Sequence, residues 1–306
     1  MALIAAMAIC LGPAEGHAAA ESGQQSGAAT DEGARPAGTA ASGAAAPAVA
    51  VGRPPARVVS INLCTDQLAL LLAAPGQLLS VSWLSQDPQS SMLAAAAARL
   101  PANHARAEEI AMLRPDLVLA GAYSAQATVA LLRRIGIPVE VFPPETDLDG
   151  IRANLRRMGG VLGRAAAADA ALARFDADLA ALTPPPGPRP RAALYSANGY
   201  SSGDASLSGA ILRAAGYANI GEEMGLGPGG VMALERLVLA APDLVVRSRH
   251  LPGHSRSEEV LDHPALAAVI ARTPAAPLSD PDWVCGTPQV TDVIARLRAA
   301  RPGGGS

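Results

Sequence analysis

The chain has 306 residues, a formal net charge of −3 and an isoelectric point of about 6.0. Half of the residues are hydrophobic but only 3% are aromatic, so aliphatic side chains must fill the interior, and the length is sufficient for two cores. The chain has no basic block, which argues against nucleic acid as a partner, and beyond the N-terminus no apolar run approaches a membrane span.

The first twenty residues have the character of a signal peptide. Residues 1–11 are uniformly apolar, and Ala18-Ala19-Ala20 offers a small-x-small cleavage site, so residues 1–20 predict export to the periplasm. Signal peptides usually begin with a basic residue, but no Lys or Arg precedes the apolar run here. Residues 21–56 are mostly Ala, Gly, Ser and Pro without periodicity, which is typical of a disordered linker.

Strand and helix patterns alternate from residue 57 to residue 146, which we interpret as an N-terminal lobe. The expected strands are 58–61, 78–82, 117–120 and 138–142, and the expected helices are 65–73 and 125–135. Such alternation predicts parallel strands joined by right-handed crossovers.

Residues 147–184 are predicted to form a helical bridge. Asp147 is a suitable N-cap for a first helix, and a second helix, about 165–182, ends at a run of prolines. Because this segment separates two α/β halves, we interpret it as a strut between lobes.

The alternation returns in residues 188–301, the predicted C-terminal lobe. Its expected strands are 191–196, 244–248 and 276–279, and its expected helices are 206–215, 232–240, 257–271 and 288–300.

One segment of the first lobe is repeated in the second. Residues 108–118 and 235–245 each begin with a glutamate, continue as a short helix, and end in Pro-Asp-Leu-Val. The repeat indicates two lobes built on one plan, with a cleft between them as the expected ligand site.

In parallel α/β sheets, ligands contact the loops that follow the carboxyl ends of the strands. Aromatic and basic residues gather in these loops, although the chain is poor in aromatics. The predicted ligand-binding residues are Trp83, Ser85, Tyr123, Tyr200, Arg247, Arg249 and Trp283.

Catalytic and metal-binding patterns are weak. The chain has no Gly-x-Ser-x-Gly, P-loop or His-Glu-x-x-His motif, and we expect neither a cofactor nor a resident metal. Two alternatives stay open: a divalent-metal (zinc or manganese) site using His250 and His254, and an exported α/β enzyme with Cys64 as nucleophile. After signal removal Cys64 and Cys285 are the only cysteines, an even pair that could form a disulfide.

Taken together, these segments resemble the periplasmic substrate-binding proteins (class III) of ABC importers for iron–siderophore complexes and cobalamin. The resemblance rests on Arg57-Val58-Val59-Ser60, the two repeated segments, Gly136-Ile137-Pro138-Val139, and the stretch from Ser208 to Ile220. It implies an α/β fold of two Rossmann-like lobes with parallel sheets, joined by a single long helix that permits only modest closure.

The resemblance also implies partners. Glu108 and Glu235 match the positions at which relatives dock into arginine pockets of the permease, the transmembrane subunits of the ABC importer, and the ligand would be a siderophore or corrinoid metal chelate. Cobalamin binders carry an aromatic residue shortly before the second glutamate, where this chain has Gly227–Gly230, so cobalamin is less secure than metal chelates as a class. Cys64 and Cys285 would lie on cleft-side loops of opposite lobes, either as a disulfide or as thiolates facing a ligand metal. We expect a monomer.

Overall fold

The computed structural model describes residues 53–301, except 185, 249, 251–252, 254, 275–277 and 279. The predicted signal peptide, most of the predicted linker, Arg249, His254 and most of the predicted strand 276–279 therefore lie outside the described part. No helix within the described part has the length and apolar character needed to cross a membrane.

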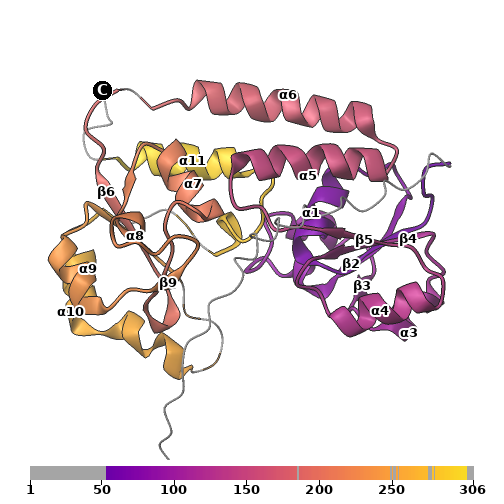
Figure 1. Ribbon diagram of the computed structural model, residues 1–306, viewed down its shortest axis with the longest axis horizontal. Coiled ribbons are helices and arrows are strands. Elements are labelled where there is room, and N and C mark those ends of the chain that lie inside the picture. The colour runs from indigo at the N-terminus through magenta and orange to yellow at the C-terminus, as the bar shows by residue number, and fades with distance from the viewer. Residues whose placement is uncertain are drawn as a thin grey trace, which may run out of the picture. The chain divides into compact units, whose positions relative to one another are not determined.

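The N-terminal half contains a five-stranded parallel sheet (Figure 1). Its strands are β1 (Val58–Ser60), β2 (Leu78–Ser82), β3 (Ala102–Asn103), β4 (Leu117–Gly121) and β5 (Val139–Phe142), and their order is β3-β2-β1-β4-β5. β1 therefore lies beside β4, and the connections on either side of this pair run in opposite directions across the sheet.

Helices cover both faces of this sheet. Successive apolar side chains along each strand point to opposite faces, so both faces must be covered. Val58 packs on one face with α1 (Leu63–Leu72), whereas Val59 packs on the other with α3 (Ala107–Met112) and α4 (Gln126–Arg134). Figure 1 shows α3 and α4 on the side of the sheet opposite to α1. The short η1 (Trp83–Gln86) and α2 (Ala94–Ala97) complete this half.

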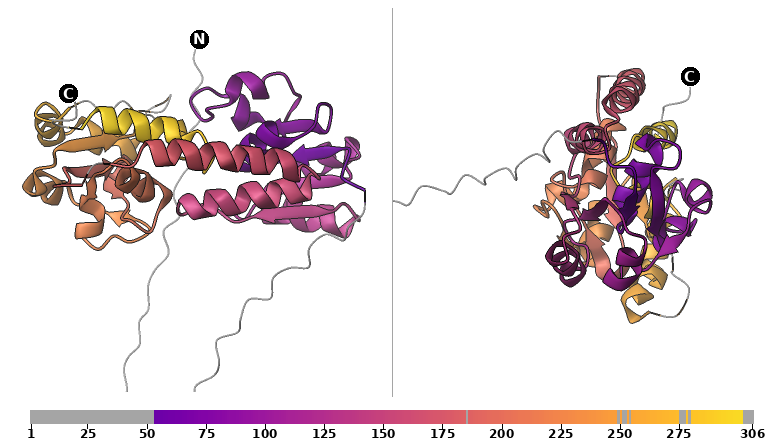
Figure 2. Two further views of the ribbon diagram at one scale, coloured as in Figure 1. Left: turned by 90° about the horizontal axis from the view of Figure 1, so that it is seen from above. Right: turned by 90° about the vertical axis from the view of Figure 1, so that its right-hand side faces the viewer.

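Two helices form the bridge. Asp147 caps α5 (Leu148–Val161) by accepting a hydrogen bond from the Gly150 N–H at 2.7 Å. After a tight turn, α6 (Ala165–Ala181) runs back alongside α5 and onward beside α11 (Val290–Ala299), as Figures 1 and 2 show. Gly159 allows the close approach, since a Cβ there would lie 2.4 Å from the Cβ of Ala168 in α6.

The C-terminal half has a three-stranded parallel sheet, ordered β10-β6-β8, and an antiparallel pair, β7-β9. The strands are β6 (Arg191–Tyr195), β7 (Tyr200–Ser201), β8 (Ala218–Asn219), β9 (Gly230–Val231) and β10 (Leu244–Arg247). The helices are η2 (Ala197–Gly199), α7 (Leu207–Ala214), α8 (Ile220–Glu223), α9 (Leu234–Ala240), η3 (Arg256–Asp262), α10 (Pro264–Ile270), η4 (Asp280–Asp282) and α11 (Val290–Ala299).

The repeated segments adopt the same structure in both halves, as α3–β4 and α9–β10. Each helix ends just before a residue with positive φ, Arg114 (46°) or Ala241 (45°), and a proline follows. The proline disfavours helical geometry in the residue that precedes it, so the helix ends earlier than the proline itself.

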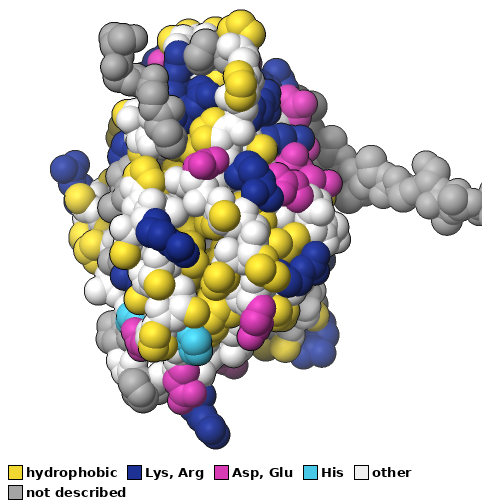
Figure 3. All heavy atoms as spheres, turned by 90° about the vertical axis from the view of Figure 1, so that its left-hand side faces the viewer, with side chains coloured by type: hydrophobic (Ala, Val, Ile, Leu, Met, Phe, Trp, Pro, Cys, Tyr) yellow, Lys and Arg dark blue, Asp and Glu magenta, His cyan; other side chains and the backbone are white. Residues whose placement is uncertain are grey.

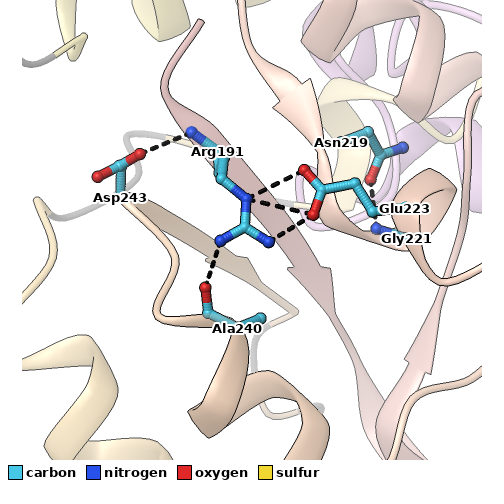
Figure 4. Close-up of polar contacts among 6 residues, drawn as sticks. All are labelled: Arg191, Asn219, Gly221, Glu223, Ala240 and Asp243. Atoms are coloured by element: carbon cyan, nitrogen blue, oxygen red, sulfur yellow. Dashed lines mark hydrogen bonds and ion pairs between the residues drawn. The ribbon is translucent and has the colours of Figure 1, made fainter.

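An arginine at the start of the central strand of each half braces the end of the repeated helix. Arg57 donates to the carbonyl oxygens of Leu113 (2.6 Å) and Arg114 (2.9 Å), and Arg191 donates to that of Ala240 at 2.5 Å (Figure 4). The aspartate of the Pro-Asp pair completes each brace through backbone N–H groups. Asp116 accepts from Ala56 and Arg57 at 2.7 and 2.9 Å, and Asp243 accepts from Arg191 at 2.7 Å.

One expected helix is corrected by the structure. The predicted helix 257–271 is two elements, η3 and α10, because His263 caps α10 and Pro264 begins it. The length alone would suffice for two cores, but much of the interior is shared between the halves. The largest cluster of buried apolar side chains continues from β1 and α1 through α5 and α6 to α7, β10 and α11.

Candidate functional site

A cavity of about 190 Å³ lies at the carboxyl ends of β1, β4 and β5. Because β1 and β4 are adjacent while their connections diverge, this position is the topological switch point of the sheet, where open α/β sheets bind their ligands. The lining residues are Asn62, Cys64, Thr65, Leu68, Gly121, Ala122, Tyr123, Phe142, Pro143, Pro144, Glu145 and Val284.

The loops after β1 and β4 are fitted to each other at the cavity. Asn62 caps α1, and its Oδ1 accepts hydrogen bonds from the N–H groups of Cys64 (3.0 Å) and Thr65 (3.3 Å). A Cβ at position 121 would lie 2.8 Å from Cγ of Asn62, so only glycine leaves room for this cap. The cap therefore sets both the start of α1 and the shape of the cavity wall.

The opposite wall comes from the segment before α11. Cys64, near the start of α1, forms a disulfide with Cys285, and the two Cα atoms are 5.0 Å apart. The Gly286 N–H also donates to Oε2 of Glu145 at 3.4 Å. Half-exposed Val284, the residue before Cys285, lines the cavity beside these two attachments. A covalent and a polar contact thus hold this segment against the end of the first sheet.

Glu145 is the carboxylate of the cavity. Its Oε1 accepts a hydrogen bond from Asn154 Nδ2 at 2.6 Å, and the same Asn154 amide donates to the Pro143 carbonyl at 2.9 Å. Burial raises the pKa of Glu145 above its usual value, against the lowering effect of the Asn154 hydrogen bond. The site therefore favours an uncharged carboxyl more than open solvent would.

A second carboxylate, Asp66 in α1, is fully buried and does not line the cavity. Its Oδ2 accepts hydrogen bonds from the Ser82 N–H (3.0 Å), the Ser82 hydroxyl and the Ser85 hydroxyl (2.6 Å). Burial raises the pKa of Asp66, and the serine hydrogen bonds oppose this effect. This group ties α1 to the loop after β2.

Of the predicted ligand-binding residues, Tyr123 lines the cavity and is 88% exposed. Ser85 needs a correction, because its side chain is fully buried and donates to Asp66, so it supports the loop rather than facing a ligand. Trp83 is half exposed and stacks with His104 at 6.4 Å between ring centroids, away from the lining of the cavity.

The remaining predicted residues belong to the second half. Tyr200 in β7 is half exposed, Arg247 at the end of β10 is exposed, and Trp283 is partly buried against the main core. None of the three lines the cavity.

The two alternative chemistries find little support. Cys64 is disulfide-bonded, so it has no thiolate to act as a nucleophile, and the enzyme hypothesis based on it is wrong. His250 contacts Asp262 (Nε2–Oδ1, 3.0 Å) and Glu258 (Nδ1–Oε2, 3.4 Å). Among the described residues, however, no group of three or more His, Cys, Asp or Glu side chains has an arrangement suited to a metal.

The two predicted docking glutamates occupy equivalent places. Glu108 is the second residue of α3, Glu235 is the second residue of α9, and both are exposed.

Several lining residues escape prediction because they come together only by folding. Phe142 is the last residue of β5, and Pro143 and Pro144 follow it; none of the three was among the predicted site residues. Val284 reaches the cavity through the disulfide, a pairing that the sequence left open. Glu145 was identifiable as a residue that follows a strand.

Comparisons with known proteins agree with this geometry. The model of the periplasmic binding protein family matches residues 58–273. A cobalamin-binding protein of Halobacterium salinarum is 29% identical over 205 residues, which are 65% of this chain. The matched region is 55% of that relative's length, so the chain spans little more than half of it.

Solved structures share the fold. A periplasmic heme-binding protein, BhuT, in complex with two hemes is 26% identical, with a TM-score of 0.62 and coverage of 80% of this chain and 98% of BhuT. The vitamin B12 binding protein BtuF of Vibrio cholerae is 18% identical, with a TM-score of 0.56 and coverage of 81% and 96%. These similarities agree with the α/β architecture of two halves joined by a helical bridge. The family match extends over most of the chain, and the protein therefore belongs to the periplasmic binding protein family.

Proposed function

We propose that the protein captures a metal chelate of the iron–siderophore, haem or corrinoid type outside the cytoplasm and delivers it to an ABC permease. The observation that carries this proposal is the cavity at the switch point of the first sheet, closed on its far side by a segment of the second half. A ligand there contacts both halves, as expected of a bilobal binding protein.

The size and lining of the cavity support a ligand that extends beyond it. Whole small-molecule sites are commonly ~300–1,000 Å³, so a cavity of about 190 Å³ would take one edge or substituent of a large chelate. The rest of the ligand would lie over exposed Tyr123 and reach aromatic or basic groups of the second half, for which Tyr200, Arg247 and Trp283 are the candidates. Flat aromatic side chains suit a planar ring system or a ligand with aromatic groups.

Delivery requires a surface for the permease. We assign this role to Glu108 and Glu235, which are exposed on equivalent helices of the two halves. Exposed carboxylates of this kind contribute more to orientation and encounter rate than to affinity.

Intrinsic fluorescence tests the ligand class, because Trp83 and Trp283 are the only tryptophans. We expect saturable quenching on titration with one of three probes: hemin, cyanocobalamin or a ferric hydroxamate. Tyr123→Ala should weaken binding of that probe about tenfold, the effect of losing one buried aromatic contact. The matched control is Ile135→Ala, because Ile135 is an exposed apolar residue at the C-terminal end of α4. This variant should bind the probe normally.

No response to any of the three probes, together with no chelate in mass spectra of the purified protein, would disprove the ligand class. Tight binding of zinc or manganese ions in calorimetry, without chelate binding, would favour instead the metal alternative around His250.

A further inference from the structure

We infer that Met112 and Leu239 are paired apolar anchors for the permease, one on each half, and that each enters an apolar pocket beside a basic side chain of that partner. The inference rests on the proposed function and extends it, because it assigns a docking role to side chains other than the two glutamates. It also requires a partner that presents the same surface twice.

The first observation is the exposure of these two side chains. Met112 is 82% exposed and Leu239 is 84% exposed, on helices that each bury part of one side. Ile110 and Leu237, the apolar residues that face inward from the same helices, are fully buried. Scattered exposed apolar side chains are common in folded proteins, so exposure alone indicates nothing.

The second observation is that the exposed positions are equivalent. Met112 follows Glu108 by one helical turn in the first repeated segment, and Leu239 follows Glu235 in the same way in the second. Residues four apart lie on one face of a helix, so each half presents a carboxylate and a large apolar side chain side by side. Packing within each half does not explain this recurrence, because the two side chains contact mainly solvent.

The neighbouring positions differ, which isolates the shared pair. Glu109 is held by His104, through the backbone N–H at 2.9 Å, whereas the equivalent position in the second half is Arg236. A partner with two identical surfaces can use only what both halves share. The shared features are the carboxylate, which calls for a basic side chain, and the apolar group, which calls for an apolar pocket.

Both anchors stand on braced supports. Arg57 holds the carbonyl oxygens that follow Met112, and Arg191 holds the one that follows Leu239 (Figure 4). Such bracing lowers the ordering cost of docking. Figure 3 shows that apolar side chains lie among acidic and basic ones on one face of the second half.

The test measures binding of the full chain to its ABC permease in lipid nanodiscs, and stimulation of the permease ATPase. Met112→Ser and Leu239→Ser should each weaken permease binding about tenfold, and the double variant about a hundredfold, as for apolar hot-spot residues. Affinity for the chelate probe should not change. The matched control is Ile135→Ser with Val231→Ser, which removes one exposed apolar side chain from each half (52% and 69% exposed) and should bind the permease normally.

Charge reversal of the two glutamates distinguishes failure of the apolar anchors from failure of the proposed docking role of Glu108 and Glu235. If Glu108→Lys with Glu235→Lys abolishes ATPase stimulation while the double serine variant binds normally, the anchors are refuted and the docking glutamates stand. If the reversal has no effect but Asp169→Lys with Asp178→Lys, two exposed acids of α6, abolishes stimulation, both the docking proposal and the anchors fail. Sedimentation gives a further test. If the wild-type chain self-associates and the double serine variant does not, while both bind the permease equally, the anchors for the permease are refuted, because a second copy of the chain would then cover Met112 and Leu239.

Discussion

At the scale of single residues, the candidate site depends on a few polar groups that are held in place before any ligand arrives. The Asn62 cap needs glycine at position 121, and the Glu145 carboxylate is held by a hydrogen bond from the Asn154 side chain. The sequence already indicated Tyr123, because it follows a predicted strand. It could not indicate that Ser85 is buried against Asp66, since a serine in a loop is usually exposed.

The raised pKa of Glu145 predicts a pH dependence of stability. Between the usual value of 4.5 and the raised value, the folded chain retains a proton that the unfolded chain has lost. The stability that Glu145 provides is therefore fully present below pH 4.5 and is lost as pH rises through the raised pKa. Glu145→Gln should melt roughly 1–2 °C above the parent chain at pH 7.5 and show no advantage at pH 4.

Thermal melts across this pH range provide the measurement. Glu108→Gln, which replaces an exposed glutamate outside the cavity, is the control for the substitution itself. A constant offset between Glu145→Gln and the parent chain from pH 4 to pH 7.5 would contradict the prediction.

At the scale of elements, the repeated segment is the clearest unit. Each copy has a short helix and a residue with positive φ before the proline. In each copy the aspartate also accepts a hydrogen bond from the backbone N–H of the arginine at the start of the neighbouring strand. The pattern Pro-Asp-Leu-Val predicted the strand and the helix end. The brace by Arg57 and Arg191 could not be predicted, because each arginine is far from its helix in the sequence.

Substituting the two aspartates should show how much these contacts contribute to the free energy of unfolding. Asp116→Ala should lower the free energy of unfolding by about 1–2 kcal/mol and Asp243→Ala by about 1 kcal/mol, because Asp116 accepts two backbone hydrogen bonds and Asp243 accepts one. Urea denaturation measures both values. Asn substitutions, which keep an acceptor, should cost less, and Asp169→Ala on the exposed face of α6 should cost almost nothing. Equal losses for all alanine variants would rule out a specific brace.

At the scale of the whole molecule, the described halves are joined at several places. The bridge of α5 and α6 covers both, the largest apolar cluster is continuous across them, and Cys64 is bonded to Cys285. These links favour small movements on ligand binding over a wide hinge rotation.

The disulfide is the link that two serine substitutions can remove. Cys64→Ser with Cys285→Ser should lower the free energy of unfolding by about 2–4 kcal/mol, since the bond closes a loop of 221 residues. It should also weaken binding of the chelate probe severalfold, because the segment with Val284 would no longer be fixed against α1. Urea denaturation and fluorescence titration test the two effects. If the variant binds the probe as tightly as the parent chain, the segment is not part of the site.

The sequence by itself determined the local features of this protein: alternating strands and helices, the helical bridge, the repeated segment and the likeness to a family. These features depend on neighbours within a few turns of chain, through apolar periodicity, capping and proline geometry. Only the tertiary structure decided which loop residues line one cavity, that Ser85 is buried, that the core is continuous, and that Cys285 lies against α1. Those outcomes depend on contacts between residues far apart in the chain, which no local pattern encodes.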